Sequence, residues 1–229
     1  MEKLIFFLVR APGMSRQEFQ QRYLQQHAPL VLQHFPRLRG FVLNINDRTE
    51  DRFDPADELT KADAVSELWF DDIDDFADLS RRYDSPEGRR LLEDDWSGLA
   101  GATLGYRVIE RVQRDFERTR AIGEASPGMK LIAPLRRAAG LSHEQFLKHW
   151  LQTHVPLALE HVLGMERYVT NEVTAPLWPG PPDLDGIVEV HYLGKREFDS
   201  PEGEAIMRAD TGKFLQPPSP LRTTEYVLL

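Results

Sequence analysis

Residues 3–9 form a continuous, largely apolar run whose length suits a strand buried on both faces. A polar segment follows, in which Ser15 and Glu18 have the spacing of a helix N-terminal capping box. Beyond it, Phe19, Tyr23 and His27 recur every four residues. Positions four apart lie on one face of a helix, so the pattern predicts a helix that packs this face inward.

The chain carries this pattern twice. Residues 3–34, KLIFFLVRAPGMSRQEFQQRYLQQHAPLVLQH, align without a gap with residues 130–161, KLIAPLRRAAGLSHEQFLKHWLQTHVPLALEH. Further on, the segment DSPEG occurs at residues 84–88 and again at residues 199–203. Self-similarity of this extent indicates a duplicated structural unit.

The rest of each copy is rich in strand-forming residues. The segments concerned are GFVLNIN, AVSELWF and GYRVIERV in the first copy and RYVTNEV, GIVEVHY and TTEYVLL in the second. Each copy therefore reads as βαββαβ, the order of a ferredoxin-like unit with two helices on one face of an antiparallel sheet. Packing the two open sheet faces together predicts an α+β fold, an intrachain pseudo-dimeric α/β barrel.

Three segments are expected along the chain. The first repeat covers residues 1–112, a linker with charge, Gly and Pro covers residues 113–128, and the second repeat covers residues 129–229. In the second repeat, LGKREF stands where the first has DDIDDFADLSRRY. We therefore expect a shortened second helix there.

Composition narrows the range of partners. The chain has 28 Lys and Arg against 37 Asp and Glu, a net charge of −9 and no Cys. This charge repels nucleic acid and anionic membranes, and the missing Cys removes thiolate chemistry. With no apolar run near the length of a bilayer span and no signal-peptide core, we expect a cytoplasmic protein, either a monomer or a homodimer of fused pseudo-dimers.

His27 and His154 occupy equivalent positions, and each precedes a proline by two residues. Because Pro29 lacks an amide proton and crowds the carbonyl four residues back, we expect the helix to kink or stop beside the histidine. Such a break aims an imidazole into a cavity, where it can act as acid or base. The alternative is that each ring only caps the freed backbone groups.

Glu67 lies in mid-strand among apolar residues and shares its strand face with Trp69. A buried carboxylate is costly unless it is paired. If this face lines a cavity under the helix, Glu67 orients His27 or acts as a base itself; if the face points outward, Glu67 is solvated. The corresponding set in the second copy is His154, Glu189 and His191.

Further side chains are candidates for binding a ligand. The aromatic candidates are Tyr23, Phe41 and Trp69, matched by Trp150, Tyr168 and His191, and the alternative is that they only form the core. Asn44 and Asn171 end their strands and either hydrogen-bond a ligand or cap a turn. His34 and His161 lie two helical turns beyond the first histidines, too far to share one metal with them unless a kink folds the helix, so no metal is expected. Nucleotide, zinc-hydrolase and serine-hydrolase motifs are absent from the sequence.

These motifs resemble the EthD domain family of the dimeric α/β-barrel superfamily, present here as a tandem. The resemblance lies in F-x3-[YW]-x3-H-x-P-L, a strand that ends in Asn, the ELWF strand and SPEG. It implies a cofactor-free pocket between sheet and helices, with His27 and His154 at the position of the acid or base. His191 departs from the pattern, where the first copy has an aromatic residue.

Two functions from different classes follow. The first is a cofactor-independent enzyme that acts through histidine proton transfer on a small hydrophobic, aromatic or lactone-like metabolite, by isomerisation, cyclisation, dehydration or decarboxylation. The second is a non-catalytic accessory protein that binds such a molecule. Because other barrels of this superfamily carry it out, cofactor-free or haem-dependent oxygenation is a third possibility.

Overall fold

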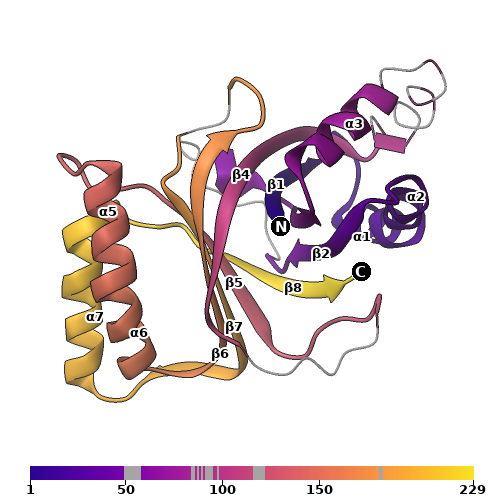
Figure 1. The fold of residues 1–229 in the computed structure, drawn as a ribbon. Coiled ribbons are helices and arrows are strands. Elements are labelled where there is room, and N and C mark those ends of the chain that lie inside the picture. Colours follow the sequence, from indigo (N-terminus) through magenta and orange to yellow (C-terminus); the bar gives the residue numbers. More distant parts are fainter. Residues whose placement is uncertain are drawn as a thin grey trace.

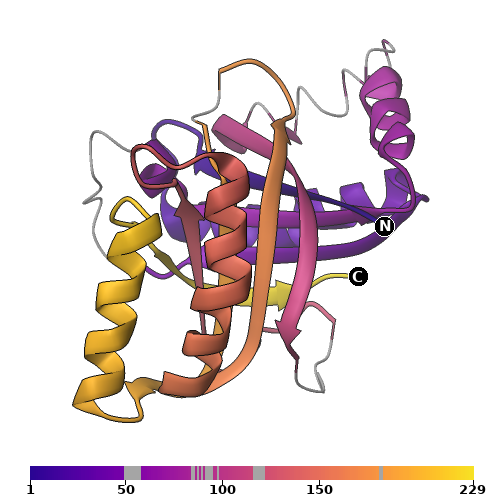
Figure 2. The ribbon, with the colours of Figure 1, turned by 60° about the vertical axis from the view of Figure 1, so that its left-hand side comes forward.

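The computed structural model describes residues 1–48, 58–83, 86, 88, 90, 95, 96, 98–115, 122–180 and 183–229. In this part of the chain, antiparallel strands close into an eight-stranded barrel (Figures 1 and 2). Around the barrel the strands follow the order β1-β3-β2-β8-β5-β7-β6-β4. Their bounds are β1 (Glu2–Arg10), β2 (Leu38–Asn46), β3 (Ala64–Phe70), β4 (Ala100–Arg114), β5 (Met129–Leu135), β6 (Val162–Pro176), β7 (Gly186–Phe198) and β8 (Leu221–Val227).

The longer helices lie outside the barrel, in two groups on opposite sides of it (Figure 1). The first group contains α1 (Arg16–Arg22), the π-helical turn η1 (Tyr23–His27), α2 (Ala28–His34) and α3 (Ile73–Tyr83). The second contains α5 (His143–His149), the π-helical turn η3 (Trp150–His154), α6 (Val155–His161) and α7 (Pro201–Phe214). A short 3-10 helix, η2 (Glu58–Lys61), precedes β3. Among the described residues, no helix is both long and apolar enough to cross a membrane.

Side-chain caps set the starts of α1 and α5, as the capping spacing predicts. Ser142 accepts from the amide of Gln145, whose side chain in turn accepts from the amide of Ser142. Ser15 likewise accepts from the amide of Glu18. These bonds satisfy backbone amides that a helix leaves without an internal partner.

The chain stays helical through the proline after each histidine, where a kink or stop was expected. The helix widens by one residue instead, so that the amide of Ala28 donates to the carbonyl of Tyr23, five residues back. Pro29 then lies in the first turn of α2, where a missing amide proton costs no helical hydrogen bond. The amide of Val155 donates to Trp150 in the same way.

The two halves of the chain differ before their last helices. The segment with no counterpart in the second half contains α3, and LGKREF instead continues β7 as strand. The helix that follows, α7, has 14 residues and begins at Ser200, which caps it within the second DSPEG. Among its described residues, the second half therefore lacks a counterpart of α3, and the expected shortening does not fall on its last helix. The first DSPEG lies largely outside the described residues, as do residues 116–121 of the expected linker.

Successive residues of β1 point to opposite faces of the sheet, and both faces are buried as its apolar run predicts. Phe6 and Leu8 join the core beneath the helices of the first group. Ile5 and Phe7 belong to a separate cluster, built from side chains that face the barrel interior. The face of β1 that points to the helices and the face that points into the barrel therefore pack in two separate clusters.

Two lysines and several glutamates form a network of ion pairs inside the barrel. Lys3 Nζ lies 2.7 Å from Glu67, 2.8 Å from Glu110 and 2.6 Å from Glu189. Lys130 Nζ lies 2.5 Å from Glu67, 2.7 Å from Glu189 and 3.1 Å from Glu225. Each lysine thus binds carboxylates from both halves of the chain.

The network favours the charged forms of Lys3, Lys130 and Glu189 although these residues are buried. Burial alone would lower the pKa of Lys3 and Lys130, but the surrounding carboxylates, Glu189 first, raise it. Burial would raise the pKa of Glu189, and the two lysines hold it well below its ordinary value. Glu67 and Glu189 therefore occupy neither a cavity under the helices nor a solvated edge, the two places expected for this face.

We predict that Lys130→Met lowers the free energy of unfolding by roughly 3–5 kcal/mol, because it leaves buried carboxylates without one of their cations. Denaturant unfolding followed by circular dichroism measures this change. Lys195→Met, at an exposed position of β7, is the matched control and should change the free energy by less than about 0.5 kcal/mol. Equal stability of the two variants would contradict the prediction.

Candidate functional site

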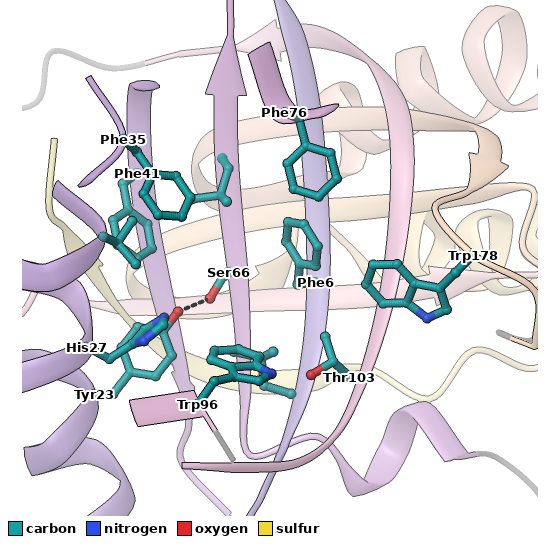
Figure 3. A pocket seen from close by; sticks show the side chains of 13 residues that line it. Phe6, Tyr23, His27, Phe35, Phe41, Ser66, Phe76, Trp96, Thr103 and Trp178 are labelled. Carbon is teal, nitrogen blue, oxygen red and sulfur yellow. Dashed lines mark hydrogen bonds between the residues drawn. The ribbon is translucent and has the colours of Figure 1, made fainter. Parts of the chain in front are cut away.

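A cavity of about 330 Å³ lies between the sheet and the helices of the first half (Figure 3). Its wall is mostly aromatic and aliphatic, with few polar groups. The lining residues are Phe6, Leu8, Tyr23, His27, Val31, Phe35, Phe41, Ser66, Leu68, Phe76, Trp96, Thr103 and Trp178. A concave, largely apolar site with few polar groups is typical of small-molecule binding sites.

The last residue of the π-helical turn, His27, is held by a carboxylate. Its side chain is buried, and Nδ1 lies 2.6 Å from Oδ2 of Asp95. Its ring also contacts Tyr23 and Trp96, with ring centroids 4.8 and 4.9 Å away. A carboxylate on one ring nitrogen keeps the proton there, so the tautomer leaves Nε2 as the acceptor for a ligand.

Beside His27, the hydroxyls of Tyr23 and Ser66 form a hydrogen bond of 2.6 Å (Figure 3). Burial raises the pKa of Tyr23, although the bond with Ser66 lowers it in part. Tyr23 therefore stays a neutral hydroxyl at physiological pH. Together with His27 it forms the polar end of an otherwise apolar cavity.

In the second half, bulky side chains pack around the corresponding histidine. Nδ1 of His154 lies 2.9 Å from Asp210, but the ring of Phe214 packs on His154 with centroids 4.9 Å apart. Trp150 takes the place of Tyr23 and fits because Gly186 has no side chain; a Cβ there would lie 2.4 Å from the indole. The imidazole of His154 is thus packed against the core.

The family model for the EthD domain matches residues 11–102 and 138–218, more than half of the chain. This chain belongs to the EthD domain family. No curated protein matches its sequence.

Solved structures share the fold of this EthD domain protein. An anthrone oxidase-like protein has a TM-score of 0.61 at 10% identity, over 99% of this chain and 92% of the other. A proposed monooxygenase from Lactobacillus acidophilus NCFM has a TM-score of 0.51 at 10% identity, over 99% and 96%. Chlorite dismutase from Candidatus Nitrospira defluvii, in complex with imidazole, has a TM-score of 0.51 at 13% identity, over 99% and 91%. These are dimeric α/β barrels, and at such identities the likeness concerns the fold alone.

Three of the candidates from the first half of the EthD domain protein meet in the cavity, namely Tyr23, His27 and Phe41. The others, Asn44, Glu67 and Trp69, lie on the opposite face of the sheet. Asn44 donates to Glu67, and Trp69 donates to Glu110 at the barrel interior. Because strand side chains alternate, Ser66 and Leu68 face the helices while Glu67 and Trp69 cannot.

The candidates from the second half of the chain are likewise divided between the two faces. His154, Trp150 and Tyr168 lie on the helical face, within or beside the second core. Asn171 donates to Glu189 inside the barrel, and a ring nitrogen of His191 lies 2.8 Å from the carbonyl of Pro127. The expected set of His154, Glu189 and His191 is therefore not assembled. Among the described residues, no group of three or more ligating side chains is placed to hold a metal.

The sequence patterns did not single out the two aspartates that bind His27 and His154. Asp95 and Asp210 stand at the same distance after the two DSPEG segments, and both bind the histidine of their own half. This repeated spacing could have identified both aspartates from the sequence. No sequence pattern points to Trp178, because only the tertiary structure brings it to a cavity of the other half.

The ring of His154 should titrate below the ordinary histidine pKa of 6.5, because burial lowers its pKa more than Asp210 raises it. Asp210→Asn removes the raising charge and should lower the pKa of His154 further. Histidine ring signals in an NMR pH titration measure both values. His161, whose pKa is raised first by its hydrogen bond to Asp199, is the internal reference and should not respond to Asp210→Asn. A pKa of His154 at or above 6.5 would contradict this prediction.

Proposed function

We propose that this EthD domain protein binds a small hydrophobic, aromatic or lactone-like molecule in the first-half cavity and transforms it by proton transfer at His27. The observation that carries the proposal is the pairing of His27 with Asp95 at the end of an apolar cavity where Tyr23 and Ser66 also lie. Such a site binds an apolar molecule and offers one oriented acid–base group to it.

The chemistry follows from the tautomer of His27. With the proton on Nδ1 held by Asp95, Nε2 can remove a proton from a carbon next to a carbonyl of the ligand and return it at another position. The neutral hydroxyl of Tyr23 can donate to the enolate oxygen formed between these steps. Isomerisation balances in this way with no further reactant, and cyclisation, dehydration and decarboxylation use the same two groups.

We interpret the protein as two ferredoxin-like repeats with one working site. Around the closed barrel, β4-β1-β3-β2 is followed by β8-β5-β7-β6. In each group the last strand of that half comes first, followed by its first, third and second strands. This shared order supports two like units joined at their edges. In the second unit, Phe214 and Trp150 fill the place of the cavity. Residues 1–112 and 129–229 remain the proposed repeats, and a cytoplasmic location and a monomer or homodimer remain predictions.

A second candidate is an accessory protein that binds the same class of molecule without transforming it. The mostly apolar wall favours this function as much as catalysis. The name of the anthrone oxidase-like neighbour raises oxidation of a bound aromatic molecule as a third candidate. Oxygen uptake by the purified protein would identify that chemistry, and a Soret band would assign it to bound haem.

The decisive change is His27→Ala. In a mass-spectrometric screen of aromatic and lactone metabolites, the variant should lose about 10²–10⁴-fold in turnover, because the acid–base group is gone. Its affinity for 1-naphthol, as a non-reactive probe, should stay within about fivefold, because the apolar wall remains. His154→Ala is the matched control and should retain turnover. Equal turnover by wild type and His27→Ala would overturn the catalytic role of His27, and ligand binding by the wild type without any turnover would favour the accessory function.

We also expect one ligand per chain. Titration calorimetry with 1-naphthol should give a stoichiometry near one, because the space beside His154 is filled. Phe35→Trp, which enlarges a side chain in the wall of the first cavity, should abolish this binding event. A stoichiometry of two would show that the second half carries a site, and binding that survives Phe35→Trp unchanged would contradict the assignment of the ligand to the first cavity.

A further inference from the structure

One wall of the cavity comes from the other half of the chain. The lining residues fall within residues 6–103 except for Trp178, which follows β6 in the second half. In Figure 3, Trp178 lies on one side of the cavity and His27 with Tyr23 on the other. The ring of Trp178 therefore limits how far a molecule can extend away from His27.

Backbone and ring contacts hold Trp178 in this position. The amide of Leu177 donates to the carbonyl of Gly105 on β4, at 2.9 Å. The indole stacks against Phe6, with ring centroids 6.2 Å apart and planes inclined by 29°. Phe6 in turn contacts Phe76, with centroids 6.0 Å apart. Trp178 thus belongs to an aromatic cluster at the end of the cavity away from His27.

Gly105 makes this close approach possible. A Cβ at Gly105 would lie 2.8 Å from Cη2 of Trp178 and 2.9 Å from Cδ1 of Leu177. Carbon atoms need a larger separation, so any side chain at position 105 would push the indole or Leu177 away. The position of the wall therefore depends on two residues that are far apart in the sequence.

The two ends of the cavity differ in chemistry, and this difference would orient a ligand. His27 and the Tyr23–Ser66 pair provide hydrogen-bonding groups at one end. Trp178, Phe6 and Phe76 provide ring faces at the other, which favour a flat aromatic group. A molecule that carries a hydroxyl or carbonyl on an aromatic ring satisfies both ends.

We propose that Trp178 is a specificity-determining residue: it stacks on the aromatic ring of a ligand whose polar group faces His27, and it sets the longest ligand the cavity accepts. This inference rests on the proposed function, because it assigns the substrate class of the same cavity. It makes the second half of the chain a direct contributor to the site of the first.

Titration calorimetry with phenol, 1-naphthol and 4-phenylphenol tests the assignment, since these probes share a hydroxyl and differ in length. Trp178→Ala should weaken phenol binding, because a stacking ring is lost. It should raise the affinity for 4-phenylphenol relative to phenol by about tenfold, because the wall is removed. Gly105→Ala leaves the tryptophan in the chain but displaces its ring, and should shift the same ratio in the same direction.

Two further variants serve as controls. Trp178→Phe keeps an aromatic wall and should keep the ratio within about threefold of wild type. Trp69→Phe changes a tryptophan on the opposite face of the sheet, at the barrel interior, and should leave the ratio unchanged.

The outcomes separate this inference from the function on which it rests. If His27→Ala loses turnover but the ratio stays within about twofold in both Trp178→Ala and Gly105→Ala, only the assignment of Trp178 fails. If the wild-type chain binds none of the three probes, both proposals fail. A shifted ratio in both variants, with Trp69→Phe unchanged, supports the assignment even if no turnover is found.

Discussion

Ion pairs between Lys3, Lys130 and glutamates from both halves occupy the inside of the barrel. Removing these charges from water is costly, and the cost is offset only when every lysine keeps its carboxylates at bonding distance. The strands that carry them must therefore stay in one register around the closed barrel. Because side chains alternate along a strand, this register also decides which residues face the helices.

The cavity depends on that alternation. With Glu67 bound inside the barrel, its neighbours Ser66 and Leu68 must face outward, where the helices of the first half cover them. The π-helical turn then brings His27 over this face and lets Pro29 follow without loss of a helical hydrogen bond. Asp95 completes the arrangement by binding Nδ1. The barrel interior with its ion pairs and the apolar cavity thus lie on opposite faces of the same strands.

Around their histidines, the two halves differ more in the size of the neighbouring side chains than in the polar groups present. Both keep a histidine bound to an aspartate, and both keep the π-helical turn. In the second half, however, Trp150 and Phe214 belong to the core, and the ring of Phe214 packs on His154. The second half instead contributes Trp178 to the first. The cavity beside His27 thus has residues of both halves in its wall.

Local signals in the sequence determined much of this protein. The strand β1, the capped starts of α1 and α5, the paired histidines and the family all follow from short-range patterns, because these depend on neighbouring residues. Only the tertiary structure decided which way Glu67 points, which residue binds His27 and that Trp178 lines the cavity. A period of two shows that Glu67 and Trp69 share a face, but only barrel closure decides whether that face is inside or outside. Contacts such as those of Asp95 and Trp178 join distant segments, and no local pattern specifies which of them meet.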